Sequence, residues 1–400
     1  MNLLYIAEHD PSLAASGVQQ RTQLIHRLFE ERASVYTLVI DWIPHPPIYD
    51  EQHKVLHYCF VKRFSIKWFW EGILGRIFPH IKIPYFNHIN SVCKNFWPDV
   101  KFDVVITRYI SNAAYTTAWQ VAPLVIDVDD IPSKCLSGSR SFKGKVFSLW
   151  EWRATYIWER KIAEHALALL LPDKKQFSHF QNCKCFYFPN IPILCMETSM
   201  FSGLPTQFIP RTSNYMLSVG TLSHLPNALG IDFFLNNYWP ELHERFPLIT
   251  YKIVGKGLPP RFADKWSKIQ GVEILGFVDD LESLYLRCLC CVAPIYSGSG
   301  TCIKVAEALS HGCDCLCTIE ATRGIDEEKI TKDNGIWVFN NAIDFQNYLQ
   351  EIIDRSDADL IRSRHRIHEF AQKMWNIENL RIEIADVLKY LSKAIPSLRF

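Results

Sequence analysis

Short apolar runs alternate with longer amphipathic stretches in the first half of the chain. The runs at 3–7, 35–40, 103–107, 124–128 and 166–171 have the length and the β-branched content of buried strands. The stretch from Val18 to Glu31 places its apolar residues three and four positions apart, which is helical spacing. Such alternation of strands and helices predicts a parallel sheet that is covered by helices on both faces.

A second alternating series begins at Tyr215. Its apolar runs at 215–220, 251–254, 272–275 and 289–295 again have the length of buried strands. Residues 189–213, which separate the two series, contain four prolines together with Ser and Thr, a composition typical of a linker.

The two series predict an α/β protein with two Rossmann-like domains that face each other across a cleft. We expect an N-terminal domain at 1–195, a linker at 196–212, a second domain at 213–375 and a C-terminal helix at 376–400. Helices near the C-terminus are expected to pack back toward the N-terminal domain. Clefts between domains are favoured places for ligands, so the cleft is the expected site.

The segment 296–312 has the pattern of a phosphate-binding loop that opens a helix. Glycines precede Thr301, and unpaired amide groups at a helix N-terminus attract anions. Four polar residues then recur at spacings of three and four and share one helical face: Thr301, Lys304, Glu307 and His311. This pattern predicts a nucleotide site. The alternative is an exposed Lys–Glu pair on an ordinary surface helix, because glycine loops are common.

Composition narrows the class of protein. The chain has 400 residues, of which 48% are hydrophobic and 21% charged, as in a soluble globular protein with two domains. Its net charge of +1 argues against a dedicated nucleic-acid binder. No run of eighteen apolar residues predicts a membrane-spanning helix. The first residues lack a basic segment and meet an acid at Glu8, so we expect a cytoplasmic protein without a secretory signal.

The thirteen cysteines fit buried structural positions better than ligand positions. Cys313, Cys315 and Cys317 alternate, as do Cys288 and Cys290, and alternation places each set on one side of a strand as small hydrophobes. No pair of C-x-x-C motifs with zinc-like spacing is present. The sequence therefore predicts neither a metal nor a disulfide network, in keeping with a reducing cytoplasm.

Residues 61–86 depart from this pattern. They carry five Lys or Arg residues against one acid, and aromatic residues are interleaved with them. A basic, aromatic, amphipathic element can lie at a membrane interface and contact anionic lipid, which would place the protein at the inner membrane face. The alternative is a helix that packs on the first domain with its lysine stems along apolar surface.

An ordered set of motifs resembles the nucleotide-sugar-binding domain of family-4 glycosyltransferases, which are retaining enzymes with a GT-B fold. The motifs are S-V-G-T-L-S-H-L-P-N at 218–227, I-V-G-K-G at 253–257, G-V-E-I-L-G-F-V-D-D at 271–280, A-P-I-Y-S-G-S-G-T-C-I-K-V-A-E-A at 293–308 and A-T-R-G-I at 321–325. The resemblance covers about residues 2–390 and is strongest from 215 to 325. It implies sugar transfer from a nucleoside-diphosphate sugar to a glycan or lipid-linked acceptor, with retention, in cell-surface polysaccharide biosynthesis.

The resemblance also implies roles for single residues. Glu307 matches the second of two family glutamates and would contact the donor ribose, whereas Ser299 stands where the first glutamate is usual, which leaves recognition of the sugar open. Thr221 replaces the usual basic residue after Gly220, so Lys304 would supply the positive charge to the diphosphate. The remaining donor-site positions are Gly17, Gly298, Gly300, Thr301 and Phe277, the last of them near the base. The family generally works without a metal ion.

In the first domain, the motif D-V-D-D-I-P-S at 127–133 stands where the family commonly has a histidine. Asp129 and Asp130 are therefore the candidate catalytic residues beside Lys304, and they would orient hydroxyl groups of donor or acceptor. The alternative is a turn or a helix N-cap before Pro132.

Other functions remain open at this point. A nicotinamide dehydrogenase would need G-x-G-x-x-G after the first strand, and a lone Gly17 is found there. A nucleotide-sugar epimerase can share the architecture. A non-catalytic scaffold protein would account for the residues Ser299 and Thr221.

Overall fold

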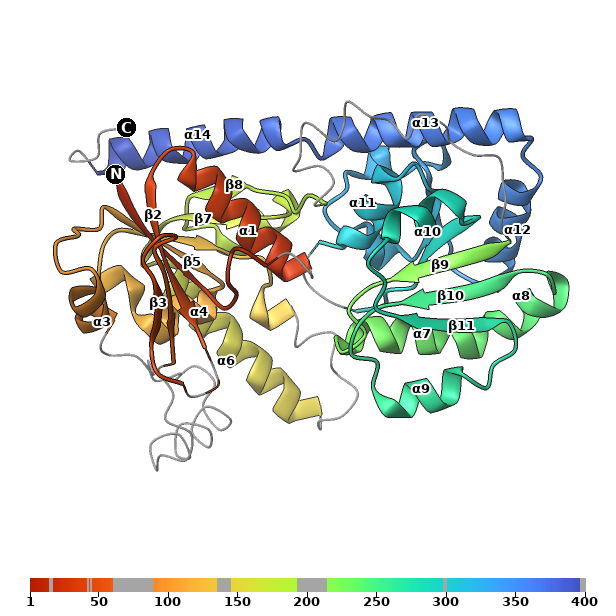
Figure 1. The fold of residues 1–400 in the computed structure, drawn as a ribbon, viewed down its shortest axis with the longest axis horizontal. Helices are drawn as coiled ribbons and strands as arrows, with labels where there is room; N and C mark the ends of the chain where they lie inside the picture. The colour runs from red at the N-terminus through yellow and green to blue at the C-terminus, as the bar shows by residue number, and fades with distance from the viewer. Residues whose placement is uncertain are drawn as a thin grey trace. The chain divides into compact units, whose positions relative to one another are not determined.

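The computed structural model describes residues 1–13, 17–41, 43, 45–59, 89–134, 145–192, 214–297 and 301–395. The chain divides into two compact units, Met1–Pro189 with Glu378–Phe400, and Asn190–Ile377 (Figure 1). Both sequence features expected between and beside the domains, the linker 196–212 and the basic segment 61–86, lie outside the described residues.

The first unit is built on an eight-stranded sheet with the order β3-β4-β2-β1-β5-β6-β7-β8. All neighbouring strands are parallel except β3 and β4. The strands are β1 (Asn2–Ala7), β2 (Ser34–Ile40), β3 (Ile48–Asp50), β4 (Val55–Tyr58), β5 (Val104–Arg108), β6 (Leu124–Asp127), β7 (Ala166–Leu171) and β8 (Cys185–Tyr187). Its α-helices are α1 (Gly17–Glu30), α3 (Ile89–Phe96), α4 (Ile110–Thr116), α6 (Lys145–Ala163) and α14 (Ile377–Ala394).

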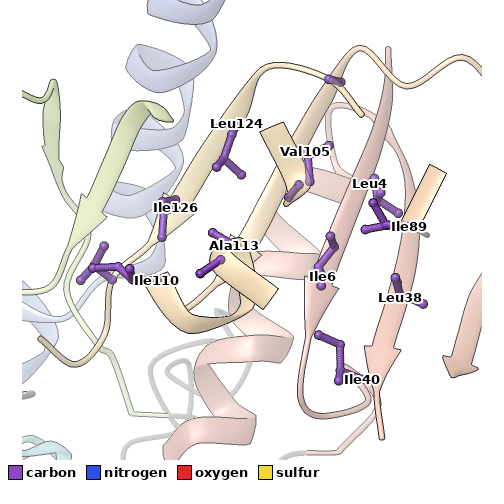
Figure 2. Close-up of a cluster of buried hydrophobic side chains, with 14 of the residues drawn as sticks. Leu4, Ile6, Leu38, Ile40, Ile89, Val105, Ile110, Ala113, Leu124 and Ile126 are labelled. Carbon is purple, nitrogen blue, oxygen red and sulfur yellow. The ribbon is translucent and has the colours of Figure 1, made fainter. Parts of the chain in front are cut away.

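The central strands of this sheet are buried on both faces. Every residue of β5 and β6 is buried, which explains why these strands appear in the sequence as continuous apolar runs. Because side chains alternate along a strand, every second residue faces the same helices. Figure 2 shows this layer: residues of β1, β2, β5 and β6, such as Leu4, Ile6 and Ile126, gather with Ile89 of α3 and Ile110 of α4.

The C-terminal helix α14 belongs to the first unit. Arg381 donates to Glu31, which directly follows α1, through Nε at 3.0 Å and Nη2 at 2.8 Å. The ring of Tyr390 lies 5.6 Å from that of Phe186 on β8. The prediction that the C-terminal segment packs back on the N-terminal domain is thus confirmed for α14.

The second unit contains a six-stranded, fully parallel sheet with the order β11-β10-β9-β12-β13-β14. The strands are β9 (Tyr215–Val219), β10 (Thr250–Val254), β11 (Val272–Gly276), β12 (Cys290–Ala293), β13 (Cys315–Cys317) and β14 (Ile336–Val338). The α-helices are α7 (Leu225–Asn237), α8 (Trp239–Arg245), α9 (Pro260–Trp266), α10 (Leu281–Arg287), α11 (Ile303–Ser310), α12 (Ala342–Ile353) and α13 (Asp357–Met374). Two parallel sheets, each with its own helices, confirm the predicted fold class.

Strand order reverses once in each sheet. In the second unit, β9 is followed outward by β10 and β11 on one side and neighbours β12 on the other. In the first unit, the corresponding neighbours are β1 and β5. Open α/β sheets bind ligands at the carboxyl ends of the strands where the order reverses, so the topology marks two places to search.

Glycines permit unusually close backbone contacts at the carboxyl ends of β9, β10 and β12. A Cβ atom on Gly255, after β10, would lie 1.8 Å from the carbonyl oxygen of Gly220, after β9. A Cβ atom on Gly230 of α7 would lie 1.9 Å from the carbonyl oxygen of Pro294, after β12. Three separate segments therefore converge with bare backbone between them.

None of the helices within the described residues is apolar over a length that would cross a bilayer.

These contacts predict a difference between glycines. Gly255→Ala and Gly230→Ala should each lower the free energy of unfolding by about 3 kcal/mol or more, because backbone must move to admit the methyl group. Gly276→Ala is the matched control: Gly276 has φ +69° but no atom within 4 Å of its Cβ position, so only about 1–2 kcal/mol of left-handed strain is expected. Urea unfolding curves measure all three, and equal losses would contradict the contact argument.

Candidate functional site

A small, partly open hollow lies where strand order reverses in the second unit. Its walls come from the ends of β9 and β12, from α7 and from α11. Ser218, Gly220 and Asn227 contribute its polar surface on one side, Pro294 lies on the β12 side, and Lys304 enters from α11. The hollow therefore lies at the place that the topology indicates.

Lys304 lies directly over Gly220. A Cβ atom at Gly220 would be 2.7 Å from Lys304 Cε and 3.6 Å from Lys304 Nζ, so a larger side chain there would occupy the lysine's position. Lys304 has no carboxylate partner among the residues that the structure describes. Its ammonium group thus reaches the loop in which Thr221 replaces a basic residue, and the predicted pair Gly220 and Lys304 is brought together.

The N-terminus of α11 is a candidate anion-binding site. Cys302, the N-cap residue, is extended at φ −91° and ψ 95°, and its side chain makes no capping hydrogen bond. Thr301 Oγ1 accepts a hydrogen bond of 2.6 Å from Asn190 Nδ2. The first-turn amide groups and the helix dipole at this end favour an anion. The predicted Gly298, Ser299 and Gly300 lie outside the described residues.

Asn227 stabilises the loop beside Lys304. It is 6% exposed, and its Nδ2 donates to the carbonyl oxygen of Thr221 at 2.8 Å. The same nitrogen lies 3.4 Å from the Cβ position of Gly220. The sequence motif at 218–227 includes Asn227, but no role was predicted for this residue. A hydrogen bond from a side chain to its own loop leaves no recognisable pattern in the sequence.

Glu307 and His311 have different surroundings, although both were predicted on one polar stripe. Glu307 is half-buried on α11, and its charge contributes, after burial, to the raised pKa of Tyr285. His311 follows the helix and stacks on the Tyr285 ring at 4.4 Å. Burial lowers the pKa of His311 to about 4, so the imidazole is neutral at physiological pH. The stripe available to a ligand therefore ends at Glu307.

Phe277 is a surface residue and not a core residue. It follows β11 and is 55% exposed. Lys256, in the loop after β10, places its Nζ 3.7 Å from the centre of the Phe277 ring. Lys256 therefore covers one face of the ring, and the packing of a base near Phe277 stays a prediction from the resemblance.

The corresponding edge of the first unit is organised by a buried ion cluster. Asp127, at the end of β6, accepts hydrogen bonds from Arg21 Nε at 3.0 Å and Arg21 Nη2 at 2.5 Å, and a further one from Arg108 Nη1. All three side chains are at most 1% exposed. Arg21 also donates to the carbonyl oxygen of Phe188 at 2.9 Å. This cluster fixes α1, which begins at Gly17, against β5 and β6.

The two predicted catalytic acids follow this cluster. Asp129 is 7% exposed and accepts a hydrogen bond of 3.2 Å from Arg108 Nη2. Asp130 is half-buried at the same turn. Asp129 is thus held as part of an ion pair, which suits a group that orients hydroxyls better than one that donates protons.

Two further residues at this edge were missed by the sequence analysis. Tyr109, directly after β5, has φ 65° and ψ 146°, a strained conformation for any residue other than glycine. Glu8, directly after β1, is half-buried, and burial raises its pKa against the opposing charge of Arg108. Backbone strain leaves no signal in residue type, and the surroundings of Glu8 depend on strands that are distant in sequence.

The comparisons with known proteins agree with this geometry. Residues 213–355 match the family model described as glycosyl transferases group 1. Among solved structures, the chain is similar to sucrose-phosphate synthase from Thermosynechococcus elongatus, with a TM-score of 0.67, 14% identity, and coverage of 98% of this chain and 99% of that one. The chain has the GT-B fold. This confirms the predicted resemblance to nucleotide-sugar glycosyltransferases of that fold.

Two other solved structures extend the comparison. HepE from Anabaena, in complex with UDP-glucose, has a TM-score of 0.62 and 15% identity, over 97% of this chain and 99% of that one. WaaG, a glycosyltransferase involved in lipopolysaccharide biosynthesis, also has a TM-score of 0.62 and 15% identity, over 96% and 99%. No curated protein has a detectably similar sequence.

The buried cluster generates a prediction. Asp127→Asn should lower the free energy of unfolding by about 3–5 kcal/mol, because it leaves the buried guanidinium of Arg21 without a carboxylate and leaves Arg108 with Asp129 alone. Glu31→Gln is the control, since it breaks the partly exposed pair with Arg381 and should cost at most about 1 kcal/mol. Chemical denaturation followed by circular dichroism measures both. Similar losses would show that the Asp127 cluster is no more than a surface-like pair.

Proposed function

We propose that the protein is a retaining glycosyltransferase of the family-4 type, which moves a sugar from a nucleoside-diphosphate sugar to a glycan or lipid-linked acceptor. The observation that carries the proposal is the ammonium group of Lys304, unpaired within the described residues, over the bare backbone of Gly220. A cation beside a helix N-terminus whose N-cap side chain makes no capping hydrogen bond is an arrangement that suits a diphosphate.

The chemistry follows from the leaving group. When the bond between the anomeric carbon and the phosphate oxygen breaks, negative charge grows on the diphosphate. Fixed positive groups stabilise that charge best when they need no rearrangement. We assign this role to Lys304 and to the amide groups at the start of α11, with Glu307 on the ribose hydroxyls and Phe277 beside the base. Gly17, Gly298, Ser299, Gly300 and Thr301 remain proposed donor contacts.

In the first unit, we assign Asp129 and Asp130 to the orientation of hydroxyl groups during transfer. The ion pair with Arg108 supports this assignment for Asp129, because it keeps the carboxylate charged and in one place. Retention and a role in cell-surface polysaccharide biosynthesis are parts of the proposal that rest on the resemblance. The cytoplasmic location and the peripheral membrane contact through residues 61–86 rest on the sequence pattern.

Binding of the donor is tested first. Because the HepE structure holds UDP-glucose, uridine diphosphate and its sugars are the first ligands to screen by thermal shift and calorimetry. We expect at least one to bind, and Lys304→Ala to weaken binding about tenfold or more, a loss of about 1.4 kcal/mol. Lys268→Ala removes the same charge from an exposed position of the same unit and should leave binding unchanged.

The result separates the enzyme from a scaffold. If the folded protein ignores every nucleotide sugar, or if Lys304→Ala and Lys268→Ala bind equally well, the proposed donor site is wrong. A non-catalytic protein would then be favoured by Thr221 and Ser299, the two positions where charged residues are usual in the family.

Catalysis is tested with the donor that binds. We expect transfer to a sugar acceptor with the anomeric configuration of the donor kept, which proton NMR of the product determines. We also propose that transfer needs no divalent cation, because Lys304 and amide groups neutralise the leaving group. Activity should therefore survive EDTA. An epimerase would instead convert the donor without any acceptor, and an inverted product would contradict retention.

A further inference from the structure

Three buried cysteines converge in the second unit, away from the donor hollow. Cys288 Sγ lies 3.2 Å from Cys313 Sγ, and Cys313 Sγ lies 3.6 Å from Cys291 Sγ. All three sulfur atoms are within 4.8 Å of one another, and within the described part of the chain they are the one group of His, Cys, Asp or Glu side chains that converges in this way. Each residue is at most 5% exposed.

The fold brings these residues together from two segments. Cys288 and Cys291 have the spacing C-x-x-C across the start of β12, and Cys313 precedes β13, which pairs with β12. Cys291 N donates to the carbonyl oxygen of Asp314 at 2.8 Å, so the two segments are held in register beside the sulfurs. Sequence analysis noted the alternating cysteines but missed this cluster, because the pairing of β12 with β13 is not encoded in spacing.

A buried cation accompanies the sulfur atoms. Arg364 of α13 is 3% exposed and donates to the carbonyl oxygen of Cys288 at 2.8 Å and to that of Tyr285 at 3.4 Å. No carboxylate among the described residues pairs with it. The guanidinium group of Arg364 therefore places a positive charge next to Cys288, where it would stabilise negative charge on sulfur.

The spacing of the sulfurs fits a metal better than a plain thiol core. A metal–sulfur bond of about 2.3 Å, with tetrahedral or trigonal angles, sets sulfur–sulfur distances of roughly 3.8–4.0 Å. The separation of 3.6 Å would have to open by roughly 0.2–0.4 Å and that of 3.2 Å by roughly 0.6–0.8 Å to reach these distances. Three thiolates, one zinc(II) ion and one guanidinium sum to zero charge, whereas copper(I) in the same site would leave a net charge of −1.

We propose that Cys288, Cys291 and Cys313 bind a thiophilic d¹⁰ metal ion, zinc(II) or copper(I), in a structural site. Thiolate ligands select these ions. The site lies at the starts of β12 and β13, whereas the donor hollow lies at the carboxyl ends of β9 and β12, so the ion would not touch the substrate. It would join β12 to the segment that leaves α11, and thereby hold the far end of the helix that carries Lys304.

Copper(I) and zinc(II) differ in the number of ligands that they need. Copper(I) is satisfied by three sulfurs, whereas zinc(II) in structural sites takes a fourth ligand. His311, two residues before Cys313, is a ligand of the required type, but its ring stacks on Tyr285 here and would have to turn. His311→Phe keeps an aromatic ring against Tyr285 and removes the nitrogen ligand. Loss of zinc binding with retention of copper(I) binding in this variant would identify the three-sulfur copper site.

The test uses the full chain, reduced and then incubated with zinc(II) or with copper(I) before desalting. Elemental analysis should find about one ion per chain. Iodoacetamide mapping in enough urea to expose buried thiols should show that metal protects three of the thirteen cysteines from alkylation. The apparent melting temperature should rise by several degrees. These measurements need no variant, so they hold even if a cysteine substitution prevents folding.

Substitutions then locate the site. Cys313→Ser, Cys288→Ser and Cys291→Ser should each lose the ion and the protection, whereas Cys290→Ser is the matched control. Cys290 is equally buried on the same strand, but it joins the core cluster on the other face of the sheet. No uptake of either ion, unchanged alkylation of the three cysteines in the presence of metal, or a Cys288–Cys313 disulfide that resists reduction would overturn the proposal.

Discussion

The position of Lys304 depends on bare backbone around Gly220. Gly255 lets β10 approach the carbonyl oxygen of Gly220, and Gly220 in turn leaves room for the stem of Lys304. Gly230 draws α7 against Pro294 at the end of β12. Close packing therefore brings the ends of three strands and two helices together, and the cation at their meeting point follows from that packing. A side chain at any of these glycines would displace the backbone or the stem of Lys304, and the ammonium group would move as a consequence.

The charged residues near the strand ends are paired in the first unit, whereas Lys304 in the second unit has no carboxylate partner among the described residues. In the first, Asp127 neutralises Arg21 and also pairs with Arg108, so these charges fix the positions of α1, β5 and β6. Because these charges neutralise one another, little net charge is left to attract a ligand. In the second, Lys304 has no carboxylate partner among the described residues and lines a hollow. An uncompensated cation is costly unless water or an anion meets it, which is why the hollow, and not the ion cluster, is the stronger candidate for a diphosphate.

The sequence was sufficient for the fold because both sheets are parallel and covered on both faces. Strands buried on both sides appear as continuous apolar runs, as in β5 and β6, and their residue ranges were found closely. Gly220 and Lys304 were also found, since a motif carries them. Contacts that depend on strand neighbours were not found: Arg108 with Asp127, the strained Tyr109, and the three sulfurs across β12 and β13. Local spacing does not contain that information.

Thr221 and Ser299, the two departures from the family pattern, affect different parts of the proposed donor site. A missing basic residue at Thr221 removes one charge from the loop after β9, yet the ammonium group of Lys304 reaches the same loop from α11. One cation at a helix N-terminus, where the side chain of Cys302 makes no capping hydrogen bond, still provides both a charge and directed amide groups for a diphosphate. Ser299 is different, because no described residue supplies a carboxylate to the hollow. We therefore expect the site to bind the diphosphate firmly and to select the sugar through some other group. Affinity for the nucleotide and preference among sugars would then be separable properties of this chain.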